Sequence, residues 1–215
     1  MAQQHSYVFP KKDMPDNERN EAIQKLRDRL DKVVLRCSVL NSMPLTVRMM
    51  MPKLKFHLVD FKTSYTNGKT ISICYEHACY LTAKELTFVV MHEVMHILLL
   101  HITRHKGLDK ELFNIATDMF INSLICDSVD GTVMTRPEWT LLSKTFTNKN
   151  YENEEAIYRA LQEMKKNGQG GGISKMKGSG KPQPGEDGQS DPDYNGADDH
   201  SKWGEEEKDE DGNPI

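Results

Sequence analysis

One segment combines an almost wholly apolar helical pattern with three side chains that are costly to bury. From Phe88 to Ile102, apolar residues occupy nearly every side of the predicted helix, which is typical of a helix inside a protein. Within it, His92, Glu93 and His96 form the pattern His-Glu-x-x-His. Burying two imidazoles and a carboxylate without partners costs on the order of several kcal/mol. The segment therefore predicts a central helix whose polar groups are compensated by a bound ion.

The spacing of the two histidines predicts how the ion is held. Residues at i and i+4 share one face of a helix, so His92 and His96 can reach the same ion. Zn²⁺ suits two imidazoles and a carboxylate, with the fourth position left for water. Glu93 projects about 100° from His92 around the axis, which favours a general base over a ligand. The alternative is that both histidines are hydrogen-bonded core residues and Glu93 pairs with a buried base.

A second apolar helix, predicted over residues 110–126, carries a matching polar stripe. Asn114, Asp118 and Asn122 follow one another at intervals of four, and Asp118 is the only charged member. We expect the stripe to face the histidines, with Asp118 as the third metal ligand and the two asparagines as supporting partners or alternative ligands. In the alternative, Asp118 orients a histidine or makes a polar contact between helices. His101 is the other candidate for a supporting role, because an unbroken helix would point it away from the ion.

The remaining patterns predict an α+β fold. Helices are expected over 17–40, 82–105, 110–126 and 152–166, and strands over 53–61 and 69–75. A capping box of Thr82 and Glu85 begins the histidine-bearing helix, and Gly107 ends it. We expect a small, mainly antiparallel sheet packed on this helix. If strand 69–75 lies at the sheet edge, it offers backbone groups to an extended peptide.

The composition changes sharply at residue 168. The last 48 residues hold 11 of the 14 glycines, and their 12 acidic residues outnumber five lysines. Such a segment cannot bury enough apolar surface to offset its ordering entropy. We therefore predict a domain over 1–167 and a Gly-rich, then acidic, disordered tail or linker over 168–215. Within the tail, His200 or Asp199 is a further candidate ligand, which would fold back onto the open position of the metal as a latent inhibitor.

Charge and hydropathy argue against two classes of partner. Residues 1–167 carry a net charge of only +3, which gives no electrostatic footprint for nucleic acid. No run of residues approaches the roughly 20 apolar positions that a bilayer requires. The four cysteines form no CxxC pair, so free thiols in a reducing compartment are expected. The first residues lack the basic and apolar regions of a secretory signal, so we expect a cytoplasmic location.

Three segments carry a resemblance to a known family: HEVMHILLLHITR from residue 92, NIATDMFIN from residue 114 and DDHSKW from residue 198. With them the chain resembles the "putative metallopeptidase domain" that precedes a VWA-like domain in certain bacterial and phage proteins. The resemblance implies a zincin-like core, a peptide or protein substrate and functional roles for His92, Glu93, His96 and Asp118. It also implies a VWA-like partner domain or protein, although this sequence ends at Ile215.

Two functional hypotheses follow from these patterns. In the first, the protein is a zinc-dependent hydrolase, a metallopeptidase that cleaves peptide bonds with Glu93 as general base. In the second, the zinc only stabilises a non-catalytic interaction module, and the acidic tail recruits partners. A zinc ion with no open coordination position would favour the second hypothesis.

Overall fold

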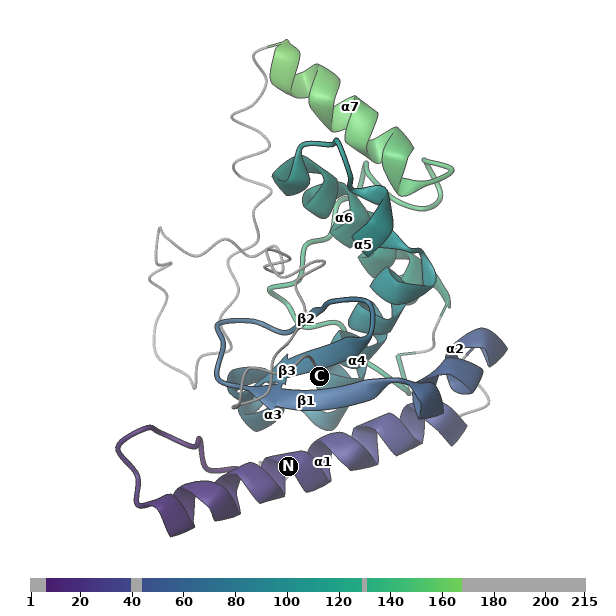
Figure 1. The fold of residues 1–215 in the computed structure, drawn as a ribbon. Helices are drawn as coiled ribbons and strands as arrows, with labels where there is room; N and C mark the ends of the chain where they lie inside the picture. The colour runs from purple at the N-terminus through teal and green to yellow at the C-terminus, as the bar shows by residue number, and fades with distance from the viewer. Residues whose placement is uncertain (1–6, 40–43, 129–130, 168–215) are drawn as a thin grey trace.

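Helices dominate the part of the chain that the computed structural model describes, which comprises residues 7–39, 44–128 and 131–167 (Figure 1). The structure is of the α+β class, as predicted, with one small sheet among the helices. In chain order the elements are α1 (Asp16–Val39), α2 (Leu45–Met50), the 3₁₀ turn η1 (Met51–Lys53), β1 (Lys55–Val59), β2 (Tyr65–Thr66), β3 (Thr70–Cys74), α3 (Tyr75–Tyr80), α4 (Ala83–Leu98), α5 (His101–Arg104), α6 (Lys110–Ser128) and α7 (Glu154–Lys166).

The sheet has three strands in the order β1-β3-β2 and is mixed. β1 pairs with β3 in parallel over five residues, from Lys55 opposite Thr70 to Val59 opposite Cys74. Only the two-residue β2 is antiparallel to β3. The prediction of a mainly antiparallel sheet is therefore wrong. The extra strand β2 reverses the chain once more, so that β1 and β3 run in the same direction.

The central position of β3 corrects a second expectation. Both of its edges are occupied, by β1 on one side and β2 on the other, so it does not form an edge of the sheet. Strand 69–75 therefore offers no free edge to an extended peptide. All five residues of β3 are buried, which is typical of a central strand.

Asn67 and Gly68 lie in the tight turn that joins β2 to β3. The side chain of Asn67 accepts hydrogen bonds from the backbone N–H groups of Lys69 and Thr70, each at 2.9 Å. Gly68 has φ +93°, a value that only glycine adopts without strain. A Cβ atom added to Gly68 would lie 3.8 Å from the side chain of Ile102. The turn therefore also packs against the segment after α4.

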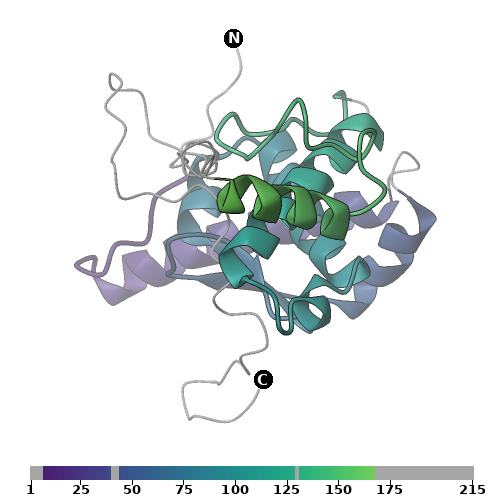
Figure 2. The same cartoon turned by 90° about the horizontal axis from the view of Figure 1, so that it is seen from above.

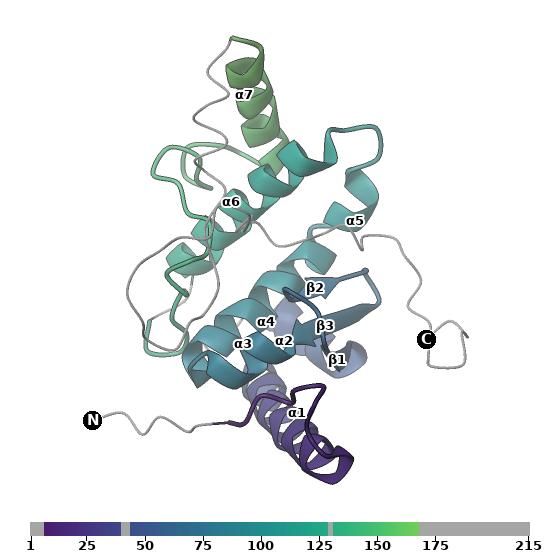
Figure 3. The ribbon, with the colours of Figure 1, turned by 90° about the vertical axis from the view of Figure 1, so that its left-hand side faces the viewer.

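α4 lies at the centre of the molecule and carries the His-Glu-x-x-His pattern. It packs against α1 on one side, α6 on another, and β2 and β3 on a third (Figure 3). The predicted capping box is confirmed: Thr82 Oγ1 accepts from the N–H of Glu85 at 3.2 Å, and Glu85 Oε2 accepts from the N–H of Thr82 at 2.8 Å. Both bonds satisfy backbone donors that the first turn leaves open.

α4 ends at Leu98, seven residues earlier than predicted. Leu100 then adopts a left-handed conformation with φ 56°, and the short helix α5 begins at His101. The side chain of Arg104 donates a hydrogen bond at 2.7 Å to the carbonyl of Leu99, an end-of-helix carbonyl that the helix itself leaves open. Leu100 is exposed, and leucine rarely adopts a left-handed conformation. The local sequence therefore does not predict that the helix ends here.

Two hydrophobic clusters fill the interior, and α6 contributes to both. The first joins α1, the sheet, α3 and α4, and it includes Ile121 and Ile125 from α6. The second lies between α6 and α7 and includes Phe113 and Met119. α1 and α7 lie at opposite ends of the molecule, with α7 packed across α6 (Figures 1 and 2). The facing surfaces of α4 and α6 thus lie where the two clusters meet.

The four cysteines are free thiols, as expected. Burial raises the pKa of Cys37 to about 12 and that of Cys79 to about 11. Such thiols behave as apolar core residues.

In the described residues, none of the helices has the length and apolar character that crossing a bilayer demands. The predicted tail over 168–215, including His200, lies outside the described residues.

The capping box makes a testable contribution to the stability of α4. Thr82→Ala removes the side-chain acceptor for the N–H of Glu85, so we expect the free energy of unfolding to fall by about 1 kcal/mol. Urea unfolding followed by circular dichroism measures the change. Thr145→Ala, at an exposed threonine in a loop, is the control and should change stability by less than about 0.5 kcal/mol. Equal effects of the two substitutions would contradict a capping role.

Candidate metal centre

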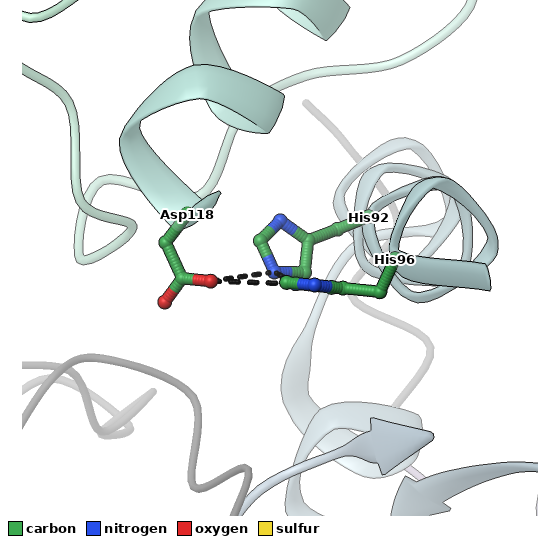
Figure 4. A group of neighbouring side chains, drawn as sticks. All are labelled: His92, His96 and Asp118. Carbon is green, nitrogen blue, oxygen red and sulfur yellow. Dashed lines mark hydrogen bonds and ion pairs between the residues drawn. The ribbon is translucent and has the colours of Figure 1, made fainter. Parts of the chain in front are cut away.

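Three buried side chains converge between α4 and α6. His92 and His96 lie one turn apart on α4, and Asp118 reaches them from α6 (Figure 4). Asp118 Oδ1 is 3.5 Å from His92 Nε2 and 3.3 Å from His96 Nε2, and the two Nε2 atoms are 2.9 Å apart. All three residues are at most 3% exposed. The predicted polar faces of the two helices do meet across the core.

The donor atoms of this group fit a divalent cation. Neighbouring ligand atoms around tetrahedral zinc, at about 2.0–2.1 Å from the ion, are separated by about 3.3–3.4 Å. The two nitrogen–oxygen distances match this separation, and the nitrogen–nitrogen distance is a few tenths of an ångström shorter. A cation between the atoms would also offset the cost of burying a carboxylate in an apolar interior. The group is thus one that could hold a metal ion.

Asn122 fixes the orientation of His92. It stands one turn after Asp118 on α6, and its Oδ1 lies 2.8 Å from His92 Nδ1. The Nδ2 group of Asn122 donates to the carbonyl of Leu141 at 2.7 Å, which orients the amide so that its oxygen faces the imidazole. His92 therefore donates from Nδ1, and its other ring nitrogen, Nε2, faces Asp118.

His96 is supported by a different route, through residues that come after the end of α4. Its Nδ1 lies 3.0 Å from Nδ1 of His101, and His101 Nε2 lies 2.8 Å from Oε1 of Glu154, the first residue of α7. His101 is fully buried and Glu154 is 2% exposed. Arg104 forms ion pairs with both Glu154 and the neighbouring Glu155. The break after α4 turns His101 back toward His96, which an unbroken helix would not allow.

Burial and hydrogen bonding oppose each other in this pair. Burial lowers the pKa of His101, although its hydrogen bond to Glu154 acts in the opposite direction. For Glu154, burial alone would raise the pKa, but the hydrogen bond from His101 and the charge of Arg104 outweigh it and lower the pKa. In this hydrogen bond the imidazole of His101 donates to the carboxylate of Glu154.

The structure also shows where two other predicted residues, Glu93 and Asn114, lie. Glu93 directly follows His92 on α4 and is fully buried. Asn114 lies one turn before Asp118 on α6 and is half-buried, and its role stays a prediction. Sequence reasoning missed Glu154, because an acidic residue at the start of a helix is explained by the helix dipole alone. It also missed Leu141, whose backbone carbonyl accepts the hydrogen bond from Asn122. Every residue has such a carbonyl, so the residue type does not indicate this role.

Three protein donors form the group within the described part of the chain.

Comparison with known proteins identifies a family. The model of a family described as "putative metallopeptidase domain" matches residues 22–214, which is most of the chain and includes every residue of the metal-binding group. Neither the curated proteins nor the solved structures gave a match. The chain therefore belongs to the family of this "putative metallopeptidase domain".

Proposed function

We propose that this protein is a zinc-dependent peptidase in which His92, His96 and Asp118 hold the metal ion and Glu93 acts as general base. The family match supports a metal-dependent peptidase acting on a peptide or protein. The observation that carries the proposal is the buried group of two imidazoles and one carboxylate with converging donor atoms. Two nitrogen ligands and one oxygen ligand are a set that zinc accepts in catalytic sites.

Zinc bound at this group would supply a Lewis acid that polarises the scissile carbonyl and makes water nucleophilic near neutral pH. The rest of the chemistry belongs to protein groups. Glu93 accepts the proton of the attacking water and then delivers it to the leaving amine, so that one carboxylate acts as base and afterwards as acid. Full burial of Glu93 favours such an exchange, because few water molecules can compete for the transferred proton.

The support of the two histidines adds to this mechanism. Asn122 holds His92 from one side, and His101 adjoins His96 from the other. Ligands that are oriented before the metal binds lose little freedom when it does, which raises metal affinity. The proposal therefore includes these residues as partners of the ligands, without a direct role in the chemistry.

Removing the general base should separate metal binding from catalysis. Glu93→Gln keeps the size of the side chain but cannot accept a proton, so we expect zinc content to stay unchanged while kcat/KM falls by about 10²–10⁴-fold. Metal analysis and cleavage of a peptide library measure the two quantities. Glu163→Gln, which changes an exposed carboxylate on α7, is the control and should retain activity.

The same experiment separates the proposal from its alternative. Full activity of Glu93→Gln would reject Glu93 as the base. Wild-type protein that is loaded with zinc but cleaves no member of a broad library would instead favour the non-catalytic, zinc-stabilised interaction module.

Loss of the carboxylate ligand should abolish the effect of the metal on stability. A ligand that binds only the folded protein stabilises it by about 4 kcal/mol at a thousand times its Kd. We expect Zn²⁺ to raise the Tm of the chelator-treated wild type, and Asp118→Asn to lose most of this shift. Asp127→Asn, at an exposed carboxylate on the same helix, should behave as the wild type. A full zinc-dependent shift in Asp118→Asn would remove Asp118 from the ligand set.

A further inference from the structure

We infer that His101 and Glu154 are positioning residues that hold the proton of His96 on Nδ1 and thereby direct the electron pair of Nε2 toward a metal ion. This inference rests on the proposed metal centre but not on the reaction performed there. It assigns a role to a buried carboxylate that stands 58 positions after His96 in the sequence and belongs to a different helix.

The chain of hydrogen bonds begins at Glu154. An ionised carboxylate only accepts hydrogen bonds, so the 2.8 Å contact between Glu154 Oε1 and His101 Nε2 requires that His101 carries a proton on Nε2. Arg104 pairs with the same oxygen atom, and a guanidinium group only donates. Both His101 and Arg104 therefore donate to Glu154, and these two donors favour the ionised form of its carboxylate.

The proton on Nε2 of His101 determines the state of His96. A neutral imidazole with a proton on Nε2 has an electron pair on Nδ1, so His101 Nδ1 is an acceptor. The atom 3.0 Å away is Nδ1 of His96, which must then be the donor. With its proton held on Nδ1, His96 presents an electron pair on Nε2, the atom that lies 3.3 Å from Asp118 Oδ1.

The two histidines of α4 reach the same state by independent routes. For His92 the acceptor is the side-chain oxygen of Asn122 on α6, one turn after Asp118. For His96 the acceptor is His101, oriented by Glu154 of α7. Two electron pairs that face each other across 2.9 Å repel unless a cation, either a metal ion or a shared proton, lies between them. The supports thus prepare both nitrogens for one ion.

The break after α4 is what makes the second route possible. In a continuous helix, a residue five positions after His96 would point about 140° away from it. The left-handed conformation of Leu100, with φ 56°, interrupts the helix and lets His101 approach the imidazole from the far side. A left-handed leucine is strained, and such strain persists where surrounding contacts require it.

The neighbouring carboxylate Glu155 provides a matched comparison. It follows Glu154 in the first turn of α7 and pairs with the same guanidinium group of Arg104. The side chain of Glu155 is more exposed than that of Glu154, and it pairs with Arg104. Substitutions at 154 and 155 therefore both disturb the ion pair between α5 and α7, but only the first removes the acceptor for His101.

The first test is the position of the proton in the metal-free wild type. Nitrogen-15 NMR of labelled histidine distinguishes Nδ1–H from Nε2–H, and the His96 signals can be identified by their loss in His96→Gln. At about pH 8.5, two units above the ordinary pKa of an imidazole, we expect His96 to carry a proton on Nδ1 and His101 to carry one on Nε2. A His96 ring with its proton on Nε2 alone would overturn the inference, and this result requires no variant of Glu154.

The second test is Zn²⁺ affinity, measured by competition with a chromophoric chelator. Glu154→Leu removes the acceptor, so we expect Zn²⁺ to bind about 10–100-fold more weakly and the Nε2–H form of His96 to become populated. Glu154→Gln should restore most of the affinity, because Arg104 turns the amide oxygen toward His101. Glu155→Leu should stay within about threefold of the wild type.

The outcomes separate this inference from the proposed peptidase. Equal losses in Glu154→Leu and Glu155→Leu, or no recovery in Glu154→Gln, would show that α7 acts only by packing and would overturn the inference. Zinc binding with the expected pattern but without peptide cleavage would leave the inference standing and reject the peptidase. If the variants at 154 do not fold, the proton positions in the wild type still decide.

Discussion

The structure depends on the compensation of polar groups buried between α4 and α6. His92, His96 and Asp118 are enclosed where two hydrophobic clusters meet, and Glu93 beside them is fully buried. In such surroundings each of these groups would destabilise the fold unless its hydrogen-bonding capacity and charge were matched. The structure meets this need with Asn122 and Leu141 on one side and with His101 and Glu154 on the other. The donor atoms that remain converge on one point, where the family relationship and the chemistry both favour a metal ion.

Patterns that act within one helix could be predicted from the sequence. The capping box at Thr82, the apolar character of α4 and the i, i+4 spacing of its histidines depend only on neighbouring residues. The facing of Asp118 toward α4 was also predictable, because a polar stripe on an otherwise apolar helix needs a polar partner. The structure brings these residues together as expected. Their role as ligands stays a prediction that metal binding must test.

Features fixed by tertiary contacts could not be predicted in this way. The sequence at the helix break near Leu100 contains no glycine or proline that would predict it. The break is instead accompanied by contacts of His101 and Arg104 with α7. The parallel pairing of β1 with β3 follows from a two-residue strand that is too short to leave a periodic pattern. Glu154 is a similar case, because the sequence around it describes an ordinary helix start.

The sharing of α6 between both hydrophobic clusters has a consequence for folding. Ile121 and Ile125 belong to the cluster around the sheet, while Phe113 and Met119 belong to the cluster beneath α7. Loss of either hydrophobic cluster would expose one side of α6 to solvent. We therefore expect the parts of the domain around the two clusters to unfold together. Melting of the domain should then be cooperative, with a single transition in which the sheet and α7 are lost together.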